Sequence, residues 1–266
     1  MLRNECCVGY WKAERKRQRR LNNKKTEGID MAELGEMVKA LGAEAYRKVL
    51  PALLVGLVPA VLVYLDVAVF KMNCDEAGIV EFTQSASLLA IATLLAVAAF
   101  QNPGLRGGLV LATGFFLTMF VRENDQWLDV IRHGCWIYPA IVVVLVSCAL
   151  ALRSWRTVLP ALLRIMSNPH AALLSVGFST TVLFSRVVGM KAIWRTAVGN
   201  DDYRVAKHVA EEGCELLGYA ILLLWAISFF RELARVRREV DDIAQKNSEG
   251  TVPLLDSEGT VPLLRR

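Results

Sequence analysis

The sequence has few of the residues that build metal and nucleotide sites in soluble enzymes. Three histidines occur in 266 residues, and the six cysteines include no Cys-x-x-Cys pair. A zinc site made of several histidines and a zinc finger are therefore both excluded. A glycine-rich phosphate loop and the nucleophile elbow of α/β-hydrolases are also missing, so neither a P-loop nucleotide-binding protein nor a hydrolase of that fold is indicated.

The sequence also lacks a nucleic-acid-binding motif and a typical signal peptide. Its net charge of +5 comes from basic residues concentrated in the first 48 positions and just after Phe230, a distribution that indicates membrane topology and lipid contact. The first apolar run begins near Leu50, far beyond the short basic region of a cleavable signal peptide, and it has the length of a spanning helix. We therefore expect no nucleic-acid partner, and we expect this first membrane helix to be retained.

Hydrophobic sequence is abundant instead. Hydrophobic residues make up 54% of the chain and the mean hydropathy is +0.37, which is too apolar for a soluble domain of this size. Six apolar runs cover residues 50–70, 79–100, 107–121, 135–152, 171–194 and 209–230. Each is near the roughly 20 residues that cross about 30 Å of hydrocarbon, except the third, which is short unless Arg122 and Glu123 lie within the bundle. The sequence predicts an all-α, polytopic integral membrane protein with a bundle of six transmembrane helices.

Polar segments flank this spanning domain, which we place at residues 49–231. Residues 1–29 form a basic arm that includes the run KAERKRQRR, and we expect the arm to be disordered and to bind anionic lipid. Residues 30–48 begin with Asp30, a residue type favoured at helix N-caps, and alternate apolar and charged faces, which predicts an amphipathic helix on the membrane surface. The sequence leaves open whether the natural start is Met1 or Met31.

The chain becomes polar again after the last apolar run. Residues 232–266 are predicted to form a cytoplasmic helical extension followed by a flexible tail. The tail contains SEGTVPLLD directly followed by SEGTVPLLR. Two short copies with Gly and Pro in each are not enough to build a solenoid, so we expect no packed repeat structure here.

Lysine and arginine near the helix ends predict the orientation. With the amino terminus inside, the inner segments contain Arg47, Lys48, Arg106, Arg153, Arg156, Arg164, Arg231, Arg235, Arg237 and Arg238. This placement satisfies the positive-inside rule. We expect a plasma membrane, specifically a bacterial inner membrane, with both termini cytoplasmic and residues 154–170 along the inner membrane surface.

The last apolar run begins with an ionisable face. In the stretch KHVAEEGCELLGYAILLLWAISFF from residue 207, four ionisable side chains share an arc of roughly 100° with Tyr219, at about 100° of rotation per helical residue. They are His208, Glu211, Glu212 and Glu215. Carboxylates at the point where a helix enters hydrocarbon must face partners or water inside the bundle. This face is therefore either the functional site or a polar lock between helices.

Other ionisable residues are predicted to lie in the same outer half of the bundle. The candidate substrate-binding or ion-binding residues are Glu81, Gln84, Arg122, Glu123, Asp125, Arg186, Glu211, Glu212 and Glu215. Such an asymmetric distribution predicts a polar cavity or an ion-pair network. Arg186 lies well inside an apolar run and requires a carboxylate partner, for which Glu215 and Asp66 have suitable depth.

A metal site is a sharper form of the same hypothesis. His208 and Glu212 are four residues apart, a spacing that lets both reach one ion, with Glu215 or His133 as a further ligand. The string from His208 to Glu212 is similar to the inverted zinc-protease motif H-x-x-E-H, but Glu212 stands where that motif has its second histidine. A divalent metal ion is therefore a candidate cofactor.

One stretch resembles a family of membrane enzymes. Cys74-Asp75-Glu76, then Glu81-Phe82 and Ser87, is similar to the segment that opens the alkaline ceramidases, which are multi-span zinc hydrolases of lipid amides. The similarity covers residues 74–87. The paired carboxy-terminal histidines of that family are missing and the expected helix count is one lower, so the chain is not identified as a member.

Three functions remain open at this point. They are binding or transport of an ion, proton or small solute; a structural or assembly role with charges as interhelical locks; and metal-dependent hydrolysis in the membrane. Crowded carboxylates on one helical turn need a proton, a cation or an arginine to neutralise them, which favours the first. Whether the protein is an enzyme, and its oligomeric state, are left open. The predicted topology also places Cys74 and Cys135 on the outer side, where a disulfide between them is a further hypothesis.

Overall fold

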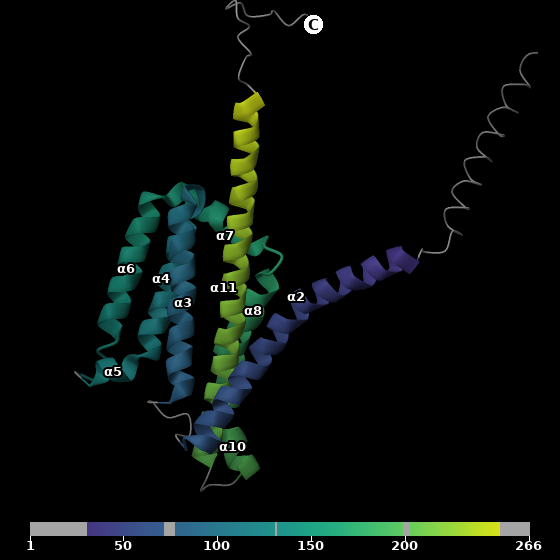
Figure 1. Ribbon diagram of the computed structural model, residues 1–266. Helices are drawn as coiled ribbons and strands as arrows, with labels where there is room; N and C mark the ends of the chain where they lie inside the picture. The colour runs from purple at the N-terminus through teal and green to yellow at the C-terminus, as the bar shows by residue number, and fades with distance from the viewer. Residues whose placement is uncertain (1–30, 72–77, 131, 199–202, 251–266) are drawn as a thin grey trace, which may run out of the picture. The chain divides into compact units, whose positions relative to one another are not determined.

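The computed structural model describes residues 31–71, 78–130, 132–198 and 203–250 (Figure 1). The predicted basic arm, the N-cap Asp30, Cys74 of the hypothesised disulfide and the chain from residue 251 onward lie outside the described residues. Contacts divide the chain into two compact units, Met1–Leu53 and Leu54–Arg266.

All of the described secondary structure is helical. In chain order the elements are α2 (Met31–Tyr64), η1 (Leu65–Val69), α3 (Ile79–Gln101), η2 (Pro103–Leu105), α4 (Arg106–Glu123), α5 (Asp125–Asp129), α6 (Ile137–Arg153), η3 (Trp155–Thr157), α7 (Val158–Met166), α8 (Ala171–Phe178), η4 (Ser179–Phe184), α9 (Ser185–Val188), α10 (Lys191–Val198) and α11 (Tyr203–Gly250). Of the irregular segments, η1 and η4 are π-helical and η2 and η3 are 3₁₀-helical.

The predicted all-α membrane fold is confirmed. Within the described ranges, five helical segments are long and apolar enough to cross a membrane: Leu34–Val69, Ile79–Gln101, Pro103–Glu123, Ala171–Val188 and Tyr203–Gln245. A sixth span results if Ile137–Arg153 is joined to Trp155–Met166, which follows it after a bend of 92°. The third span reaches the required length because Arg122 and Glu123 continue helix α4.

The first unit contains the amino-terminal part of α2. This helix runs from Met31 to Tyr64 without interruption, so the segment predicted as a surface helix and the predicted first span belong to one helix. Apolar side chains along the part that precedes Leu54 are exposed, with Leu41 at 70%. Charged residues pair along the same helix, as in the 2.9 Å contact between Lys48 and Glu44. The location of this part on a membrane surface stays a prediction.

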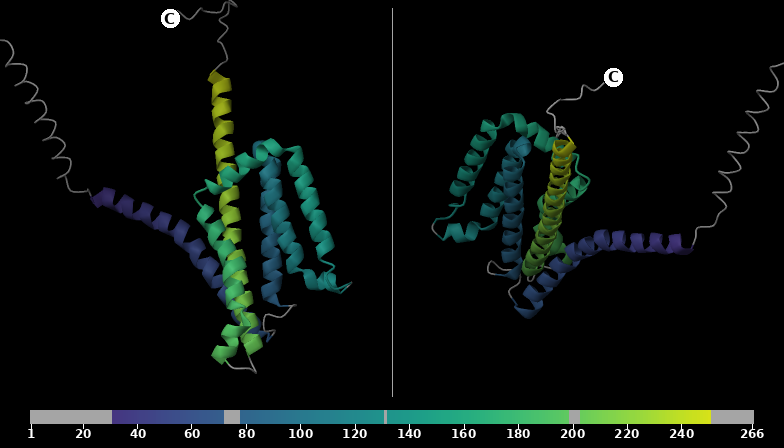
Figure 2. Two further views of the ribbon diagram at one scale, coloured as in Figure 1. Left: turned by 180° about the vertical axis from the view of Figure 1, so that it is seen from behind. Right: turned by 45° about the horizontal axis from the view of Figure 1, so that its top comes forward.

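The second unit is built around α3, α4 and α11. The three helices α3, α4 and α6 lie side by side, and α8 lies alongside α11 in all views (Figures 1 and 2). Leu88 and Ile91 of α3, Leu109 of α4 and Leu222 and Trp225 of α11 are fully buried between them. Because lipid is as apolar as these side chains, close packing rather than transfer from water must hold such helices together.

Aromatic rings and small residues provide that packing. Phe116 of α4 stacks on Trp225 at 6.3 Å between ring centroids, and Trp225 stacks on Phe229 at 5.6 Å. Elsewhere glycine permits close approach: a Cβ on Gly114 would lie 2.0 Å from Ser147 Oγ of α6. Small residues at helix crossings are the common means by which membrane helices approach closely.

The fifth apolar run differs from its predicted boundary. We predicted a span over residues 171–194, but the spanning segment ends at Val188 and the chain restarts as the separate helix α10. Gly189 closes the first helix by donating its N–H to the Ser185 carbonyl at 2.7 Å. Trp194 then turns back and donates its indole N–H to the Val188 carbonyl at 2.6 Å. The predicted carboxy-terminal boundary was wrong because hydropathy alone does not register this break.

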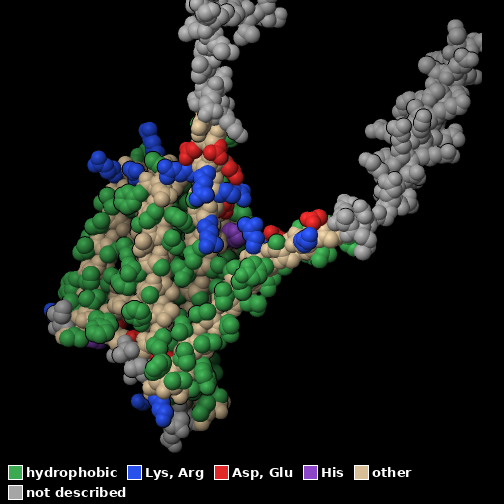
Figure 3. All heavy atoms as spheres, in the orientation of Figure 1, with side chains coloured by type: hydrophobic (Ala, Val, Ile, Leu, Met, Phe, Trp, Pro, Cys, Tyr) green, Lys and Arg blue, Asp and Glu red, His purple; other side chains and the backbone are tan. Residues whose placement is uncertain are grey.

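Helix α7 follows the sharp bend after α6. Gly107 of α4 donates its N–H to Thr157 Oγ1 at 2.7 Å, which fixes the bend against the start of α4. Arg164 of α7 contacts Glu232 of α11 at 2.8 Å, and Asn168 also donates to Glu232. Lys and Arg side chains gather at this end of the second unit, whereas hydrophobic side chains cover its flanks (Figure 3).

Candidate functional site

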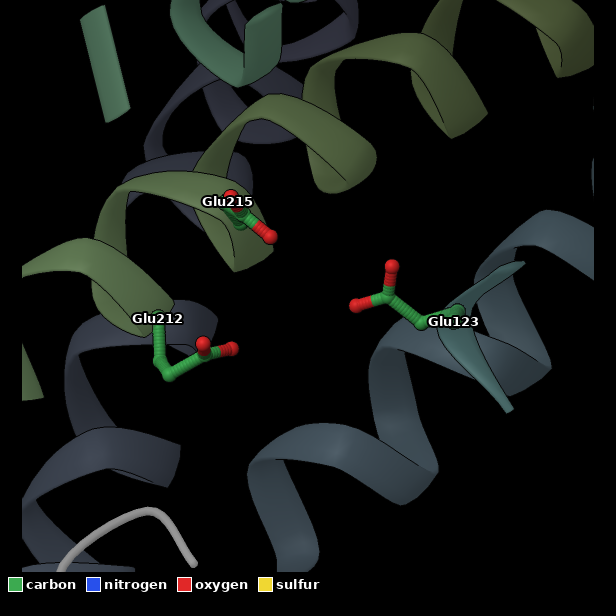
Figure 4. A group of neighbouring side chains, drawn as sticks. All are labelled: Glu123, Glu212 and Glu215. Carbon is green, nitrogen blue, oxygen red and sulfur yellow. The ribbon is translucent and has the colours of Figure 1, made fainter. Parts of the chain in front are cut away.

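Three carboxylates from two helices point toward one another (Figure 4). Glu212 and Glu215 are three residues apart on α11 and share a face, while Glu123 is the last residue of α4. One oxygen from each lies within 4.8 Å of the others. The sequence predicted all three as site residues, and the structure brings them together.

The cluster is largely buried. The side chains of Glu123, Glu212 and Glu215 are 7%, 16% and 5% exposed. Buried carboxylates at this separation repel one another unless protons, cations or hydrogen-bond donors compensate for the charge. The neighbouring residues therefore decide what the cluster can do.

Basic side chains compensate for part of this charge. Arg186 Nη2 lies 2.8 Å from Glu215 Oε1, and its Nη1 lies 3.0 Å from Glu211 Oε1. Glu211 also contacts Lys207 at 2.6 Å. Arg122 Nη1 lies 3.7 Å from Glu123 Oε2, a looser contact.

Uncharged hydrogen-bonding groups also contact the three carboxylates. The Tyr219 hydroxyl donates to Glu123 Oε2 at 3.0 Å. Gln84 Nε2 of α3 lies 3.1 Å from both the side-chain and the backbone oxygen of Glu212. The Ser185 hydroxyl lies 3.2 Å from Glu215 Oε1 and also contacts the Thr181 carbonyl.

One acceptor beside the cluster has no partner. Gln84 is fully buried, and its Oε1 makes no hydrogen bond although its Nε2 contacts Glu212. Burying an amide oxygen without a partner costs on the order of 1–3 kcal/mol, so a native protein usually supplies a donor, a water or an ion. The Gln84 Oε1 atom is therefore available to accept a hydrogen bond or to coordinate an ion next to the three carboxylates.

Counting charges shows a negative surplus. Among the described residues, the acidic side chains around the cluster are Glu123, Glu211, Glu212 and Glu215, and the basic side chains in contact with them are Arg122, Arg186 and Lys207, with His208 3.9 Å from Glu212. In a medium of low dielectric constant such a surplus is costly. A bound cation or bound protons would remove it.

The π-helical segment η4 aligns α9 with this cluster. Gly177, Thr181 and Ser185 follow one another at intervals of four residues, which gives the helix a face of small side chains. Gly218 of α11 faces it so closely that a Cβ there would lie 2.0 Å from Thr181 Oγ1. This approach brings Ser185 to Glu215 and leaves Arg186 beside it. Single π-helical turns are often found at functional sites.

A small cavity adjoins Glu123 on the side of α3 and α5. Its volume is about 170 Å³, and its lining includes Glu81, Ser85, Glu123, Asn124 and Trp127. Gln126 donates to both oxygens of Glu81 at 2.7 and 2.8 Å, and Asn124 donates to Ser85 at 2.9 Å. The cavity provides a space beside the cluster that is lined by both polar and apolar side chains.

Some predicted residues do not join the three carboxylates. Asp125 begins α5 and, within the described chain, has no polar contact with them. His208 Nδ1 is 3.9 Å from Glu212 Oε1 and is not part of the group of three, so Glu123 takes the place that we gave to His208 in the metal hypothesis. Asp66 is fully buried, but it accepts the Ile79 N–H at 2.8 Å and thereby caps α3.

Sequence reasoning did not name three neighbours of the site. The sequence does contain a signal for Lys207, which precedes Glu211 by four residues on one helix, the spacing of an ion pair. We did not use this spacing. Ser185 and Gln126 have no such signal, since their contacts depend on the π-helical turn and on the short helix α5.

Comparisons of this chain with protein-family models, with curated proteins and with solved structures found no match. The functional assignment therefore rests on the site itself.

Proposed function

We propose that this multi-pass membrane protein binds a divalent cation through Glu123, Glu212 and Glu215, as part of ion binding or transport. The observation that carries the proposal is the approach of three largely buried carboxylates to within 4.8 Å of one another. Their mutual repulsion becomes attraction to a shared ion once the ion is present. The unpartnered Gln84 oxygen beside Glu212 adds a fourth potential ligand.

The ligand set favours a hard cation. Carboxylate and amide oxygens suit Mg²⁺, Ca²⁺ and Mn²⁺, whereas zinc sites are dominated by cysteine and histidine. His208 lies near Glu212, but it stands outside the group of three, and Cys214 faces a different direction on the α11 wheel from its neighbours Glu212 and Glu215.

The proposal also places the site in the membrane. We infer that the cluster lies near the outer face of a plasma membrane and that both termini are cytoplasmic. The positive-inside distribution of Lys and Arg supports this orientation. Glu212 and Glu232 are separated by about 30 Å along α11 at 1.5 Å per residue, which matches the thickness of the hydrocarbon layer.

A structural role is the second candidate, and one specific observation favours it. Arg186 joins α9 to two carboxylates of α11, the arrangement expected of an interhelical lock. A lock needs no ion, and its function would survive removal of divalent cations. The two candidates therefore differ in one measurable property.

The test is a titration of purified protein in lipid nanodiscs. After treatment with a chelator, Mg²⁺, Ca²⁺, Mn²⁺ and Zn²⁺ are added separately at constant ionic strength, and thermal unfolding and binding heat are recorded. We expect a saturable stabilisation, about 2.7 kcal/mol at a free ion concentration of 100 times Kd. We expect Glu123→Gln and Glu212→Gln each to abolish it.

The matched control is Glu232→Gln. Glu232 is also a partly buried, arginine-paired carboxylate, but it lies at the other end of α11. This variant should keep the cation response even though it weakens the fold. If the unchanged protein shows no stabilisation by any of the four ions, the cation site is rejected and the structural role remains.

A further inference from the structure

A second, mainly apolar hollow lies between α3, α4 and α6. Its volume is about 610 Å³, within the roughly 300–1,000 Å³ typical of small-molecule sites. Its walls include Ala99 of α3, Val110 and Leu117 of α4 and Leu150 of α6, whereas Arg106 and Arg153 lie at one end. The hollow therefore combines a long apolar wall with a cationic end.

The two arginines occupy that end because of how the helices meet. Arg106 begins α4 and Arg153 ends α6, and both line the same hollow. The two chain segments are fixed there: Gly107 donates to Thr157 Oγ1, and a Cβ on Gly107 would lie 2.6 Å from the Ser154 carbonyl oxygen.

In the described part of the chain, neither arginine has an ion-pair partner. Over the residues that the structure describes, no acidic side chain contacts the guanidinium of Arg106 or of Arg153. Both side chains are exposed. The charge of this end is therefore complementary to an anion.

We propose that the hollow binds one anionic phospholipid. The phosphate group contacts Arg106 and Arg153, and one acyl chain lies along the apolar wall toward Val110 and Leu117. Guanidinium groups match phosphate with two parallel hydrogen bonds, and basic pockets between transmembrane helices are known to bind anionic headgroups. Charge complementarity selects an anionic lipid over a zwitterionic one, and the apolar wall selects a lipid over free phosphate.

This site is separate from the carboxylate cluster. Arg106 and Glu123 are the first and last residues of α4, about 26 Å apart at 1.5 Å per residue. A negative result in the cation titration therefore leaves the lipid proposal unaffected, and a negative result in the lipid experiment leaves the cation proposal unaffected.

The test measures lipid retention by native mass spectrometry of the full chain. Protein in detergent is mixed with phosphatidylglycerol or phosphatidylcholine of identical acyl chains, and in a further arm with glycerol 3-phosphate, which has the phosphate but no chain. We expect at least a tenfold preference for phosphatidylglycerol over phosphatidylcholine, with weaker retention of glycerol 3-phosphate. We expect the double change Arg106→Gln with Arg153→Gln to remove the preference.

Two further variants separate the contributions. Arg156→Gln is the matched control, because Arg156 is exposed near the same end but stacks over the Trp155 ring at 5.5 Å and does not line the hollow. It should keep the preference. Val146→Phe fills the hollow without touching either arginine and should reduce retention of both lipids while thermal stability stays unchanged.

Three results would overturn the proposal. Equal retention of the two lipids would identify ordinary bulk lipid in the hollow. A preference that survives the double arginine change would place the headgroup elsewhere. Retention of glycerol 3-phosphate as strong as that of phosphatidylglycerol would identify a site for free phosphate.

Discussion

Arg186 Nη2 lies 2.8 Å from Glu215 Oε1, and the two residues differ sharply in burial. The arginine side chain is 50% exposed, whereas the glutamate side chain is 5% exposed. The same guanidinium also reaches Glu211 at 3.0 Å. Loss of Arg186 would therefore leave the Glu215 carboxylate buried without this ion pair. Loss of Glu215 would leave Arg186 half exposed and still paired with Glu211.

This asymmetry sets the expected cost of Glu215→Ala. Breaking a fully buried ion pair costs about 3–5 kcal/mol because the remaining charge is stranded. Arg186 is not stranded, since it keeps Glu211, so we expect a loss of about 1–2 kcal/mol. Unfolding in detergent, measured for Glu215→Ala and for Glu215→Gln, tests this value. The glutamine variant should lose less because it keeps an acceptor for Ser185.

The reverse change gives the control. Arg186→Gln leaves Glu215 buried without a cation, so it should destabilise the protein more than Glu215→Ala does. If wild type and Glu215→Ala are equally stable, the Glu215 side chain contributes nothing to the free energy of unfolding. The ion pair with Arg186 would then have no structural role.

Glu123→Gln is expected to stabilise the protein when divalent ions are absent. The change removes one of three repelling carboxylates, and the new amide oxygen still accepts the Tyr219 hydroxyl. We expect a gain of about 1 kcal/mol in chelator that turns into a relative loss at saturating divalent cation. Thermal unfolding in chelator and at saturating cation measures whether the stability difference between Glu123→Gln and wild type changes sign.

Glu232→Gln separates this effect from carboxylate removal in general. It takes the charged partner from Arg164, so it should destabilise the protein with and without the ion. If Glu123→Gln behaves in the same way, repulsion within the cluster is not the dominant effect.

The proposed orientation is tested by cysteine labelling. In a background without native cysteines, a single cysteine at Asp201 should react with a membrane-impermeant reagent added to intact cells. A cysteine in residues 251–266 should react only after the cells are opened, because the positive-inside rule places the carboxy terminus in the cytoplasm. Labelling of the tail in intact cells would reverse the proposed orientation.

Much of the fold could be predicted because the bilayer imposes length and polarity. The apolar runs beginning at Ile79 and near Gly107 correspond to α3 and α4, and the buried charge at the end of the third run follows from its short length. The partner of Arg186 was narrowed to two carboxylates by depth, and Glu215 is confirmed as a contact. Asp66 instead caps α3.

The parts that were missed depend on interactions that hydropathy does not encode. The fifth span ends at Val188, where Gly189 is the C-cap and the Trp194 indole donates to the Val188 carbonyl. The approach of Glu123 to α11 depends on how α3 holds both helices, and no spacing in the sequence records that distance. His208 shares a face with Glu212, but sharing a face does not bring its ring into the group of three.

A close contact between α4 and α6 gives a direct test of packing. Gly114 of α4 faces Ser147 of α6, and a Cβ at Gly114 would lie 2.0 Å from Ser147 Oγ and 2.4 Å from its Cβ. Gly114→Ala must therefore push α4 and α6 apart, and we expect a loss of about 1–3 kcal/mol. Gly35→Ala is the matched control, because nothing lies within 4 Å of a Cβ there. In an exposed helix it should be neutral or stabilising by up to about 1 kcal/mol.

Rescue by a second change identifies the cause of that loss. Ser147→Gly removes both atoms that a new methyl group would strike, and the nearest remaining atom, Ser147 Cα, would be 3.9 Å away, an ordinary contact distance. The double variant Gly114→Ala with Ser147→Gly should therefore recover most of the stability lost by Gly114→Ala, in a double-mutant cycle of thermal unfolding. Ser147→Ala should rescue poorly, since its Cβ stays in place. Equal rescue by alanine and glycine, or none by either, would show that the steric contact between α4 and α6 is not what Gly114 protects.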